Sequence, residues 1–323
     1  MQWTDRLGYR LKLRDLHILL AVVESGSMSK AAQRLAVSAP VVSKAVADIE
    51  HTFGVRMLDR TPQGVEPTSH GRALLDSGIA AFDALKQGAR QIEFLSNPTA
   101  GEVRVGCSEP FAAGLLPAIV EKMGRQYPGI VCHVVQTPSA PTLEFRELRE
   151  RRVDLVVARF DKSIAEDLEA KVLYREQVYV VAGRRSKWAR RRRIALAELV
   201  DEPWLMTPAD TLPTLLFERA FQRCNVALPK PAVVSLSIHL RNALLPSGRY
   251  LGVLPGSLLR YGVLRGKVKV LPVEFPADSG PVGIITLRNR SVSATAKLFI
   301  DAAQKLAEPL CAVPAAPRVL PRH

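Results

Sequence analysis

Apolar residues between positions 13 and 53 recur at three- and four-residue steps, in three segments separated by short polar turns. This spacing predicts three amphipathic helices, the first of which stops at Ser25 and Gly26. Ser29 is placed to cap the second helix, and three residues ending at Ser38 lead into a third helix. The last two helices have the spacing of a helix-turn-helix. The residues predicted to face inward are Leu13, Leu16, Leu19, Leu20, Val23, Ala31, Ala32, Leu35, Val42, Val46, Ile49 and Phe53.

The third helix is predicted to have two different faces. Opposite its apolar stripe, the residues are polar or small. A narrow outer face that donates hydrogen bonds fits the DNA major groove, where the N-terminal residues of such a helix reach base edges. Residues 56–68 then hold Pro62, Gly64 and Pro67 between apolar residues, which predicts a two-stranded wing. The turn, the caps and the wing together favour a DNA-reading unit over a small helical bundle with solvated polar faces.

The stretch from Ser25 to Lys44, SGSMSKAAQRLAVSAPVVSK, resembles the winged helix-turn-helix of LysR-type transcriptional regulators. The resemblance continues through FGVRMLDRT and GVEPT to Gly71, and with the later chain it covers residues 9–308. It implies double-stranded promoter DNA as a partner, and RNA polymerase as well when such a regulator activates. This chain has Ala39 where the family usually has a hydrogen-bonding residue, and alanine can touch a thymine methyl but cannot pair with a base edge. The candidate DNA contacts are Ser29, Lys30, Arg34, Ser38, Ala39, Pro40, Ser43, Lys44, Arg60 and Thr68.

After the DNA-binding segment, 9–68, the pattern over residues 69–96 predicts one long helix. Its apolar positions form a seam of three heptads, weakened by Gly78 and Ala89, which favours a coiled coil over a helix packed on its own domain. The resemblance implies that this helix pairs with a second subunit and that two dimers join through their effector domains. Residues 97–101 break the helix and are predicted to be a hinge. The candidate dimer contacts are Leu75, Phe82, Leu85 and Ile92.

From residue 102 to residue 308 the pattern alternates strands and helices, which predicts an α/β fold with parallel strands. The resemblance implies a two-lobed effector domain similar to periplasmic solute-binding proteins. It places lobe 1 at 102–168 and 268–308, and lobe 2 at 169–267. The Pro/Ala-rich tail, 309–323, is predicted to be disordered. The predicted strands are 101–107, 130–135, 153–158, 177–182, 250–255 and 282–287, and the predicted helices 111–127, 141–151, 212–224 and 293–307.

Ligands of open α/β sheets sit beyond the carboxyl ends of strands, where helix N-termini present free N–H groups. Ser108, Ser139 and Arg159 follow the first three strands of this domain. By the resemblance, Thr207 and His239 hold comparable positions in the second lobe. Each serine also fits a plain helix cap, and His239 fits a satisfied surface or core histidine. Taken together, these five candidates suit an anionic or polyhydroxylated small molecule.

Charge is unevenly distributed along the chain, which carries +14 overall. Residues 1–96 hold 12 Lys and Arg against 10 Asp and Glu, so +2 of the excess lies there and +12, from 33 against 21, lies in residues 97–323. Basicity alone is therefore weak support for DNA contact. The run from Arg184 to Arg193 has seven cations in ten residues. Its place between a strand and a helix favours a solvated loop, with DNA contact as the alternative. Neutralising Arg190 to Arg193 would separate the two, since a tenfold loss of operator affinity would indicate contact.

Several classes of protein are disfavoured because the sequence lacks their motifs. The four cysteines have no CxxC spacing and no nearby histidine cluster, so we expect reduced thiols in a cytoplasmic protein and no metal; a redox-sensing pair stays an alternative. No apolar N-terminal segment or bilayer-length run is present, which disfavours secretion and a membrane partner. We find no nucleophile motif or phosphate loop, and therefore expect neither an enzyme nor a cofactor. The winged segment argues against a solute receptor of the same two-lobed fold.

Overall fold

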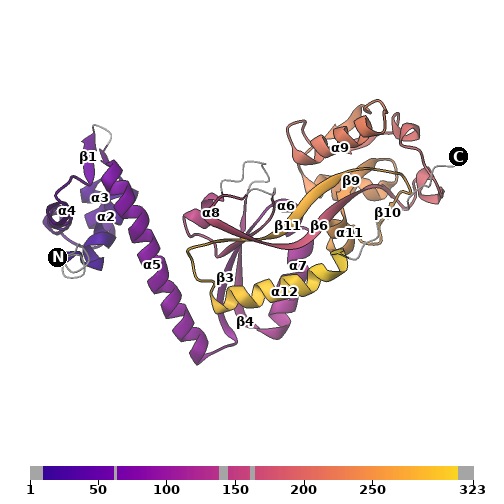
Figure 1. Cartoon of the computed structure of the whole chain (residues 1–323). Coiled ribbons are helices and arrows are strands. Elements are labelled where there is room, and N and C mark those ends of the chain that lie inside the picture. The colour runs from indigo at the N-terminus through magenta and orange to yellow at the C-terminus, as the bar shows by residue number, and fades with distance from the viewer. Residues whose placement is uncertain (1–9, 62–63, 138–144, 161–163, 312–323) are drawn as a thin grey trace. The chain divides into compact units, whose positions relative to one another are not determined.

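The computed structural model of the protein describes residues 10–61, 64–137, 145–160 and 164–311. The chain divides into two compact units, one ending at Ala89 and the other beginning at Arg90, which are described separately (Figure 1). The N-terminal unit consists of three short helices, a hairpin and most of one long helix. Its elements are α2 (Leu13–Ser25), α3 (Met28–Arg34), α4 (Ala39–Phe53), β1 (Leu58–Thr61), β2 (Gly64–Pro67) and α5 (Ser69–Ser96).

The predicted helix-turn-helix and wing are confirmed, with one cap displaced. α2 ends as expected at Gly26, whose φ of 65° is left-handed. The cap of α3 is Ser27 rather than Ser29, and its Oγ accepts a hydrogen bond from the backbone N–H of Lys30 at 3.4 Å. A cap residue has an extended backbone and precedes the first helical turn, and the turn at Gly26 puts Ser27 in that place. Ser38 precedes α4 with an extended backbone, but its hydroxyl makes no capping bond.

The N-terminal core is formed by the inner faces of α2, α3 and α4, with β1 and the start of α5. Val42, Val46 and Ile49 of α4 are all buried, as the periodicity predicts. Leu13 is wrongly predicted as core, because it is 50% exposed, whereas Ile18 and Val22 of the same helix are buried. The stripe of α2 is therefore rotated toward those two residues. The remaining members of this core are Leu19, Ala21, Ala31, Ala32, Ala45, Met57, Leu58 and Leu75.

Helix α5 has different surroundings in its two halves. Leu75 lies in the N-terminal core, and the Phe82 ring meets His17 edge-on at 5.8 Å between centroids. Farther along, Leu85 and Ile92 are 54% and 67% exposed. Placing Leu75 in a dimer seam is therefore wrong: its side chain is already buried in its own unit. The first half of the helix packs on its domain, and the second half leaves an apolar stripe uncovered.

The second unit is built on one mixed sheet in the order β4-β3-β5-β11-β6-β9-β7-β8, with β10 paired to β6. β3 is parallel to β4 and β5, as expected, whereas β11 runs antiparallel to both of its neighbours. The strands are β3 (Ala100–Cys107), β4 (Gly129–Gln136), β5 (Leu155–Arg159), β6 (Leu168–Gly183), β7 (Trp204–Met206), β8 (Pro231–Val234), β9 (Leu251–Pro255), β10 (Val268–Val270) and β11 (Asp278–Leu287).

The long strand β6 carries the chain from one lobe to the other. Its residues up to Gln177 pair with β11 of the first lobe, and from Val178 onward they pair with β9 and β10 of the second. The predicted crossings near residues 168 and 267 are therefore too early, because β10 belongs to the second lobe. The charged residues Glu169, Lys171 and Glu176 obscured the first half of this strand in the sequence.

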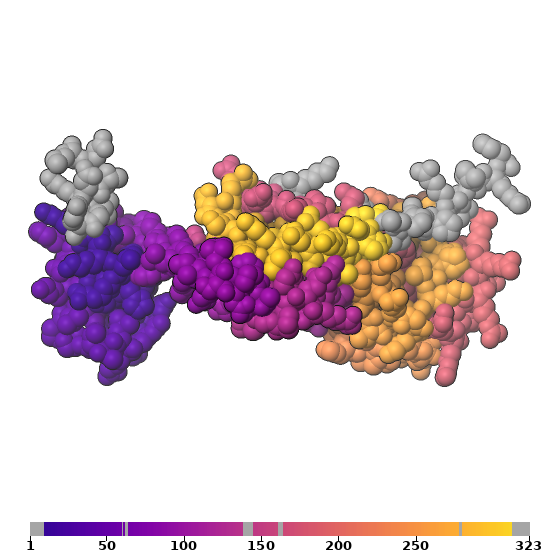
Figure 2. Space-filling view, turned by 90° about the horizontal axis from the view of Figure 1, so that it is seen from below, coloured from indigo at the N-terminus to yellow at the C-terminus, as the bar shows by residue number. Residues whose placement is uncertain are grey.

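Helices pack on both lobes. In the space-filling view, α12 forms a continuous strip along the first lobe, where it contacts α7 (Figure 2). The predicted helix 111–127 is two helices, since the chain breaks at Gly114. α12 continues through Pro309, and Leu310 is buried, so residues 309–311 are helical rather than disordered. The helices are α6 (Glu109–Ala112), α7 (Leu115–Gln126), α8 (Arg146–Arg149), α9 (Leu212–Arg223), α10 (Ile238–Leu244), α11 (Gly256–Tyr261) and α12 (Ala294–Cys311), with short 3₁₀ turns η1 (Lys187–Arg190), η2 (Leu196–Leu199) and η3 (Leu245–Ser247).

The C-terminal end of α5 forms ion pairs with residues of the sheet. Arg90, near the end of α5, pairs with Glu102 of β3 and lies 3.7 Å from Asp154. Asp154 in turn accepts a hydrogen bond from the backbone N–H of Arg104 at 2.9 Å and one from Arg290 at 3.1 Å. These bonds lie within the second unit and attach the end of α5, from Arg90 onward, to the sheet.

Candidate nucleic-acid interface and ligand pocket

The outer face of α4 is open to solvent. Ala39, Pro40, Ser43 and Lys44 are all exposed, and so is Ser38 just before the helix. Apolar Val41 is also 37% exposed on this helix. A helix with a buried inner stripe and an uncovered N-terminal outer face has the form of a recognition helix. The exposed donors available to bases or phosphates are few, and small apolar groups lie between them.

The remaining predicted DNA contacts have varied surroundings. Ser29 and Lys30 are exposed on α3, and Arg34 is exposed but pairs with Glu24 at 2.6 Å. Arg60 lies opposite Val65 in the wing, and its side chain is outside the described part of the structure. The Thr68 hydroxyl donates to the Arg56 carbonyl at 2.8 Å and accepts from the Gly71 N–H at 3.0 Å. Thr68 is thus the cap of α5, and its hydroxyl proton is used in the hydrogen bond to the Arg56 carbonyl.

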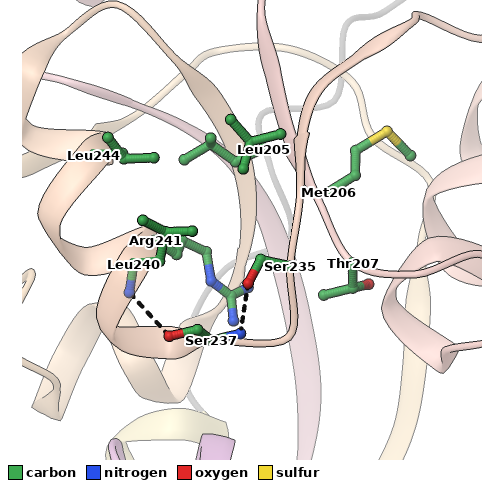
Figure 3. Close-up of a pocket in the computed structure, with 9 residues that line it drawn as sticks. Leu205, Met206, Thr207, Ser235, Ser237, Leu240, Arg241 and Leu244 are labelled. Carbon is green, nitrogen blue, oxygen red and sulfur yellow. Dashed lines mark hydrogen bonds between the residues drawn. The ribbon is translucent and has the colours of Figure 1, made fainter.

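A pocket in the second lobe lies between β7, β8 and α10 (Figure 3). The pocket is open to solvent, and the empty space between its walls, open solvent included, is about 260 Å³. Its walls are mostly aliphatic, with three hydroxyls and one guanidinium among them. A small site with apolar walls and a few convergent polar groups is typical of metabolite binding. The lining residues are Leu205, Met206, Thr207, Val233, Ser235, Ser237, Leu240, Arg241 and Leu244.

Arg241 is the charged group of this pocket. In Figure 3 its side chain extends from α10 toward Ser235 and Ser237. Burial lowers the pKa of Arg241 below its ordinary value, although a guanidinium remains protonated at neutral pH. Within the described part of the chain, no carboxylate forms an ion pair with Arg241. A largely buried cation with no counter-charge favours binding of an anion.

The hydroxyls of the pocket are held in place by the chain itself. The Thr207 hydroxyl lies 2.6 Å from that of Thr211 and 2.9 Å from that of Thr214. Ser235 accepts the N–H of Ser237 at 3.1 Å, and Ser237 accepts that of Leu240 at 3.2 Å as the cap of α10. Both serines act as acceptors in these bonds, so their own protons remain available to a ligand oxygen.

The predicted second-lobe residues are only partly brought together. Thr207 lines the pocket, as proposed from the sequence, but His239 is exposed and is not among the lining residues. Arg241 follows His239 by two residues in α10, so the two side chains lie on nearly opposite sides of the helix. Arg241 therefore lines the pocket while His239 faces solvent. Sequence reasoning missed Arg241 because it did not identify α10. The signal that was available is Ser237, a cap residue followed by a short amphipathic turn.

The first-lobe candidates lie at the carboxyl ends of β3 and β5. Ser108 is 7% exposed, and its hydroxyl makes no capping bond although it precedes α6. The Nε of Arg159 is buried and has no hydrogen-bond partner. Burial lowers the pKa of Arg159, and the nearby charge of Glu176 opposes that shift. Ser139 lies outside the described residues. Both described candidates thus have unfilled hydrogen-bonding capacity, as a ligand site requires.

The carboxylate of Glu176 organises the region around Arg159. It accepts a hydrogen bond from the Ser257 hydroxyl at 2.6 Å and one from the Tyr174 hydroxyl at 3.2 Å. Burial raises the pKa of Glu176, while the bonds from Ser257 oppose that change. Glu176 lies beside the crossing point of β6, and Ser257 lies in α11, so this network joins elements of the two lobes.

Among the described residues, no group of three or more His, Cys, Asp or Glu is arranged to hold a metal ion. Within the same residues, no helix combines the length and the apolar character needed to cross a bilayer. Burial and the charge of Glu109 raise the pKa of Cys107 to about 11, so this thiol is protonated at neutral pH.

Two family models match the chain. Residues 13–72 match the model described as "Bacterial regulatory helix-turn-helix protein, lysR family", and residues 96–308 match "LysR substrate binding domain". The first covers the helix-turn-helix with its wing, and the second covers the two-lobed sheet. Together they account for well over half of the chain.

Relatives and solved structures agree with this assignment. The chain is 26% identical over 293 residues to the transcriptional dual regulator GltC of Bacillus subtilis, covering 90% of this chain and 96% of that protein. It is 24% identical over 306 residues to the HTH-type transcriptional regulator YdcI of Escherichia coli, covering 94% of this chain and 99% of that protein.

Among solved structures, a full-length OxyR variant from Pseudomonas aeruginosa matches with a TM-score of 0.62 at 20% identity, covering 93% of this chain and 98% of that one. CbnR complexed with its target DNA matches with a TM-score of 0.51 at 19% identity, covering 92% of this chain and 100% of that one. The chain belongs to the LysR family, as a DNA-binding transcriptional regulator with a C-terminal effector-binding domain.

Proposed function

We propose that this regulator reads promoter DNA through the outer face of α4, and that a small anionic effector held by the two lobes changes that binding. The observation that carries the effector half is Arg241, a largely buried cation without a counter-charge that lines a pocket between β7, β8 and α10. The observation that carries the DNA half is the exposed face of α4 above a fully buried inner stripe.

For DNA contact we propose Ser38, Ser43 and Lys44 at the groove, with Ala39 and Pro40 in apolar contact. Arg34, Arg60, Ser29 and Lys30 would flank it on the phosphates. Thr68 is left out of this set, since its hydroxyl is used as a cap. The apolar start of the helix favours thymine methyl groups over hydrogen-bonded base edges, so we expect A·T-rich half-sites.

Replacing Lys44 with alanine is expected to weaken binding to all DNA sequences alike. Lys44 is exposed, and a lysine that contacts one phosphate contributes about 0.9 to the slope of log affinity against log salt concentration. The slope should fall by about one while the preferred sequence, selected from a random duplex pool, stays the same. Lys86→Ala, an exposed lysine on α5, is the control and should change neither. Unchanged affinity and slope for Lys44→Ala would show that this face of α4 does not meet DNA.

The effector would act by closing the lobes. Ser108 and Arg159 belong to the first lobe, and Thr207 and Arg241 to the second, so one ligand bonded to both favours a closed arrangement. A ligand shifts such an equilibrium only through a difference in affinity for the two states. We propose that closure changes the spacing of DNA-binding domains within an oligomer, and with it the bend of the promoter and the access of RNA polymerase.

Arg241→Gln is expected to weaken stabilisation by anionic ligands. A charge-assisted hydrogen bond contributes roughly 1.5–3 kcal/mol, so its loss raises the ligand concentration needed by about ten- to a hundredfold. Thermal-shift measurement against small carboxylates, phosphates and neutral polyols would identify ligands, and the variant should bind the anionic ones more weakly. Arg219→Gln, an exposed arginine of α9, should keep them. Ser108→Ala should cost a smaller, several-fold factor and leave DNA affinity unchanged. Ligands that stabilise wild type and Arg241→Gln equally would rule out this pocket.

A further inference from the structure

A dense group of cations covers one end of the second lobe. We call it the lobe 2 basic patch. All of its members are exposed. Seven belong to the Arg-rich run after β6, and four come from two other segments, around β10 and before β9. The patch comprises Arg184, Arg185, Lys187, Arg190, Arg191, Arg192, Arg193, Arg249, Arg265, Lys267 and Lys269.

Two hydrogen bonds and one close backbone approach bring the three segments of the lobe 2 basic patch together. The Arg184 N–H donates to the Lys267 carbonyl at 3.4 Å, and the Lys269 ammonium donates to the Ala189 carbonyl at 2.5 Å. Gly248, next to Arg249, approaches Arg185 so closely that a Cβ on it would lie 2.9 Å from the Arg185 carbonyl carbon. The structure thus places on one surface charges that the sequence separates by up to 85 positions.

The Arg-rich run is a folded turn rather than a free loop. Ser186 caps the 3₁₀ turn η1 by accepting the N–H of Trp188. The Trp188 ring is buried, and it lies 5.3 Å from the Lys187 ammonium and 6.0 Å from the Arg191 guanidinium, close enough for cation–π contact. The cations of the run therefore project from an anchored base, which lowers the entropy cost of holding them in one arrangement.

Little negative charge offsets the lobe 2 basic patch. Lys187 pairs with Glu202 at 2.6 Å, and Arg191 pairs with Glu198 at 2.8 Å. The other nine cations form no ion pair with any carboxylate in the described part of the chain. Like charges at this density repel one another, and a polyanion relieves that repulsion. The patch is therefore complementary to a polyanion.

We propose that the lobe 2 basic patch is a second, sequence-independent DNA surface that contacts the phosphate backbone. Eight of the eleven cations are arginines, and arginine and lysine side chains are the groups that neutralise DNA phosphates. DNA is also the polyanion that this family binds through its other unit. From the sequence alone, a solvated loop is favoured for Arg190 to Arg193. The structure adds two observations that favour DNA contact: the run is an anchored turn, and four cations from other segments lie beside it. This contact is independent of the proposed effector switch.

The test uses the full chain and a 60-bp duplex of random sequence as the probe. The patch variant combines Arg184→Gln, Arg185→Gln, Arg190→Gln, Arg192→Gln and Arg193→Gln, all at exposed positions. A control with the same loss of charge combines Arg125→Gln, Arg219→Gln, Lys230→Gln, Lys297→Gln and Lys305→Gln, which are exposed elsewhere on the effector unit. Fluorescence anisotropy over a range of salt concentrations gives the affinity and the salt slope for each protein.

The patch variant should lose at least tenfold in affinity at low salt, and its slope should fall by about 2 to 4, since each lost phosphate contact removes about 0.9. The control should change much less, because its charges do not lie at the contact. Equal slopes for the patch variant and the control would overturn the proposal and leave an acidic protein surface as the partner that fits the charge. The sequence preference of the Lys44→Ala variant is measured in a separate experiment. That experiment tests DNA contact by α4, so failure of the patch proposal can be told from failure of the α4 proposal.

Discussion

Replacing Gly71 with alanine is expected to destabilise the DNA-binding unit strongly. A Cβ at this position would lie 2.0 Å from the Met57 carbonyl oxygen, a distance that no rotamer change relieves because both atoms are fixed to the backbone. Met57 is itself 2% exposed, and its carbonyl accepts the N–H of Thr68 at 3.0 Å, so neither partner has room to move. We expect a loss of at least about 3 kcal/mol, a large share of the roughly 5–15 kcal/mol that stabilises a typical domain.

Thermal denaturation followed by circular dichroism measures this loss, together with DNA binding at a temperature below the wild-type melting transition. Gly124→Ala, at an exposed position within α7, is the control for a glycine-to-alanine change in a helix. Nothing lies within 4 Å of a Cβ at Gly124, so alanine there should stabilise the helix by about 0.4–1 kcal/mol. A Gly71→Ala protein that melts with the wild-type profile would mean that α5 does not cross Met57 as closely as described.

Replacing Ile92 with aspartate is expected to give monomers that bind DNA poorly. Leu85, Ile92 and Leu95 are 54%, 67% and 71% exposed on one helix, at the seven- and three-residue spacings of a coiled-coil seam. We propose that a second copy of the chain covers them. An unpaired carboxylate in such a seam costs about 3–5 kcal/mol, which raises the dimer dissociation constant by roughly two orders of magnitude or more.

Sedimentation velocity measures assembly of the Ile92→Asp protein, and anisotropy measures its DNA affinity, which should fall at least tenfold as one of two half-site contacts is lost. Gln91→Asp introduces the same charge at the neighbouring exposed position, off the stripe, and should stay wild type in both assays. Leu75 and Phe82 are poor sites for this test, because they pack within their own unit and their replacement would also destabilise it. A wild-type sedimentation coefficient for Ile92→Asp would contradict the seam.

The candidate DNA surface was readable from the sequence because it depends on local rules. The inner stripe of α4 follows helical periodicity, and each end of the helix is marked by a local residue, Pro40 in the first turn and Gly54 at the stop. Even there, the choice between Ser27 and Ser29 as the cap of α3 depended on the backbone turn at Gly26, which residue types alone do not report.

The ligand pocket was not readable in the same way. Its walls are β7, β8 and α10, which are three, four and seven residues long and too short for a periodic pattern. Trp204 pairs with Leu251 in the parallel ladder of β7 and β9, a register set by distant chain rather than by neighbours. Arg241 was missed for this reason, and His239 was chosen in its place.

By itself, the sequence determined the helix-turn-helix, the outer face of α4, the long helix and the two-lobed α/β plan, because periodicity, capping residues and family motifs are local properties of the chain. Tertiary structure decided which half of α5 is free, where β6 crosses between lobes, which arginine enters the pocket, and that cations from three segments meet on one surface. Each of these depends on contacts between residues far apart in sequence, whose pairing follows from packing the whole unit.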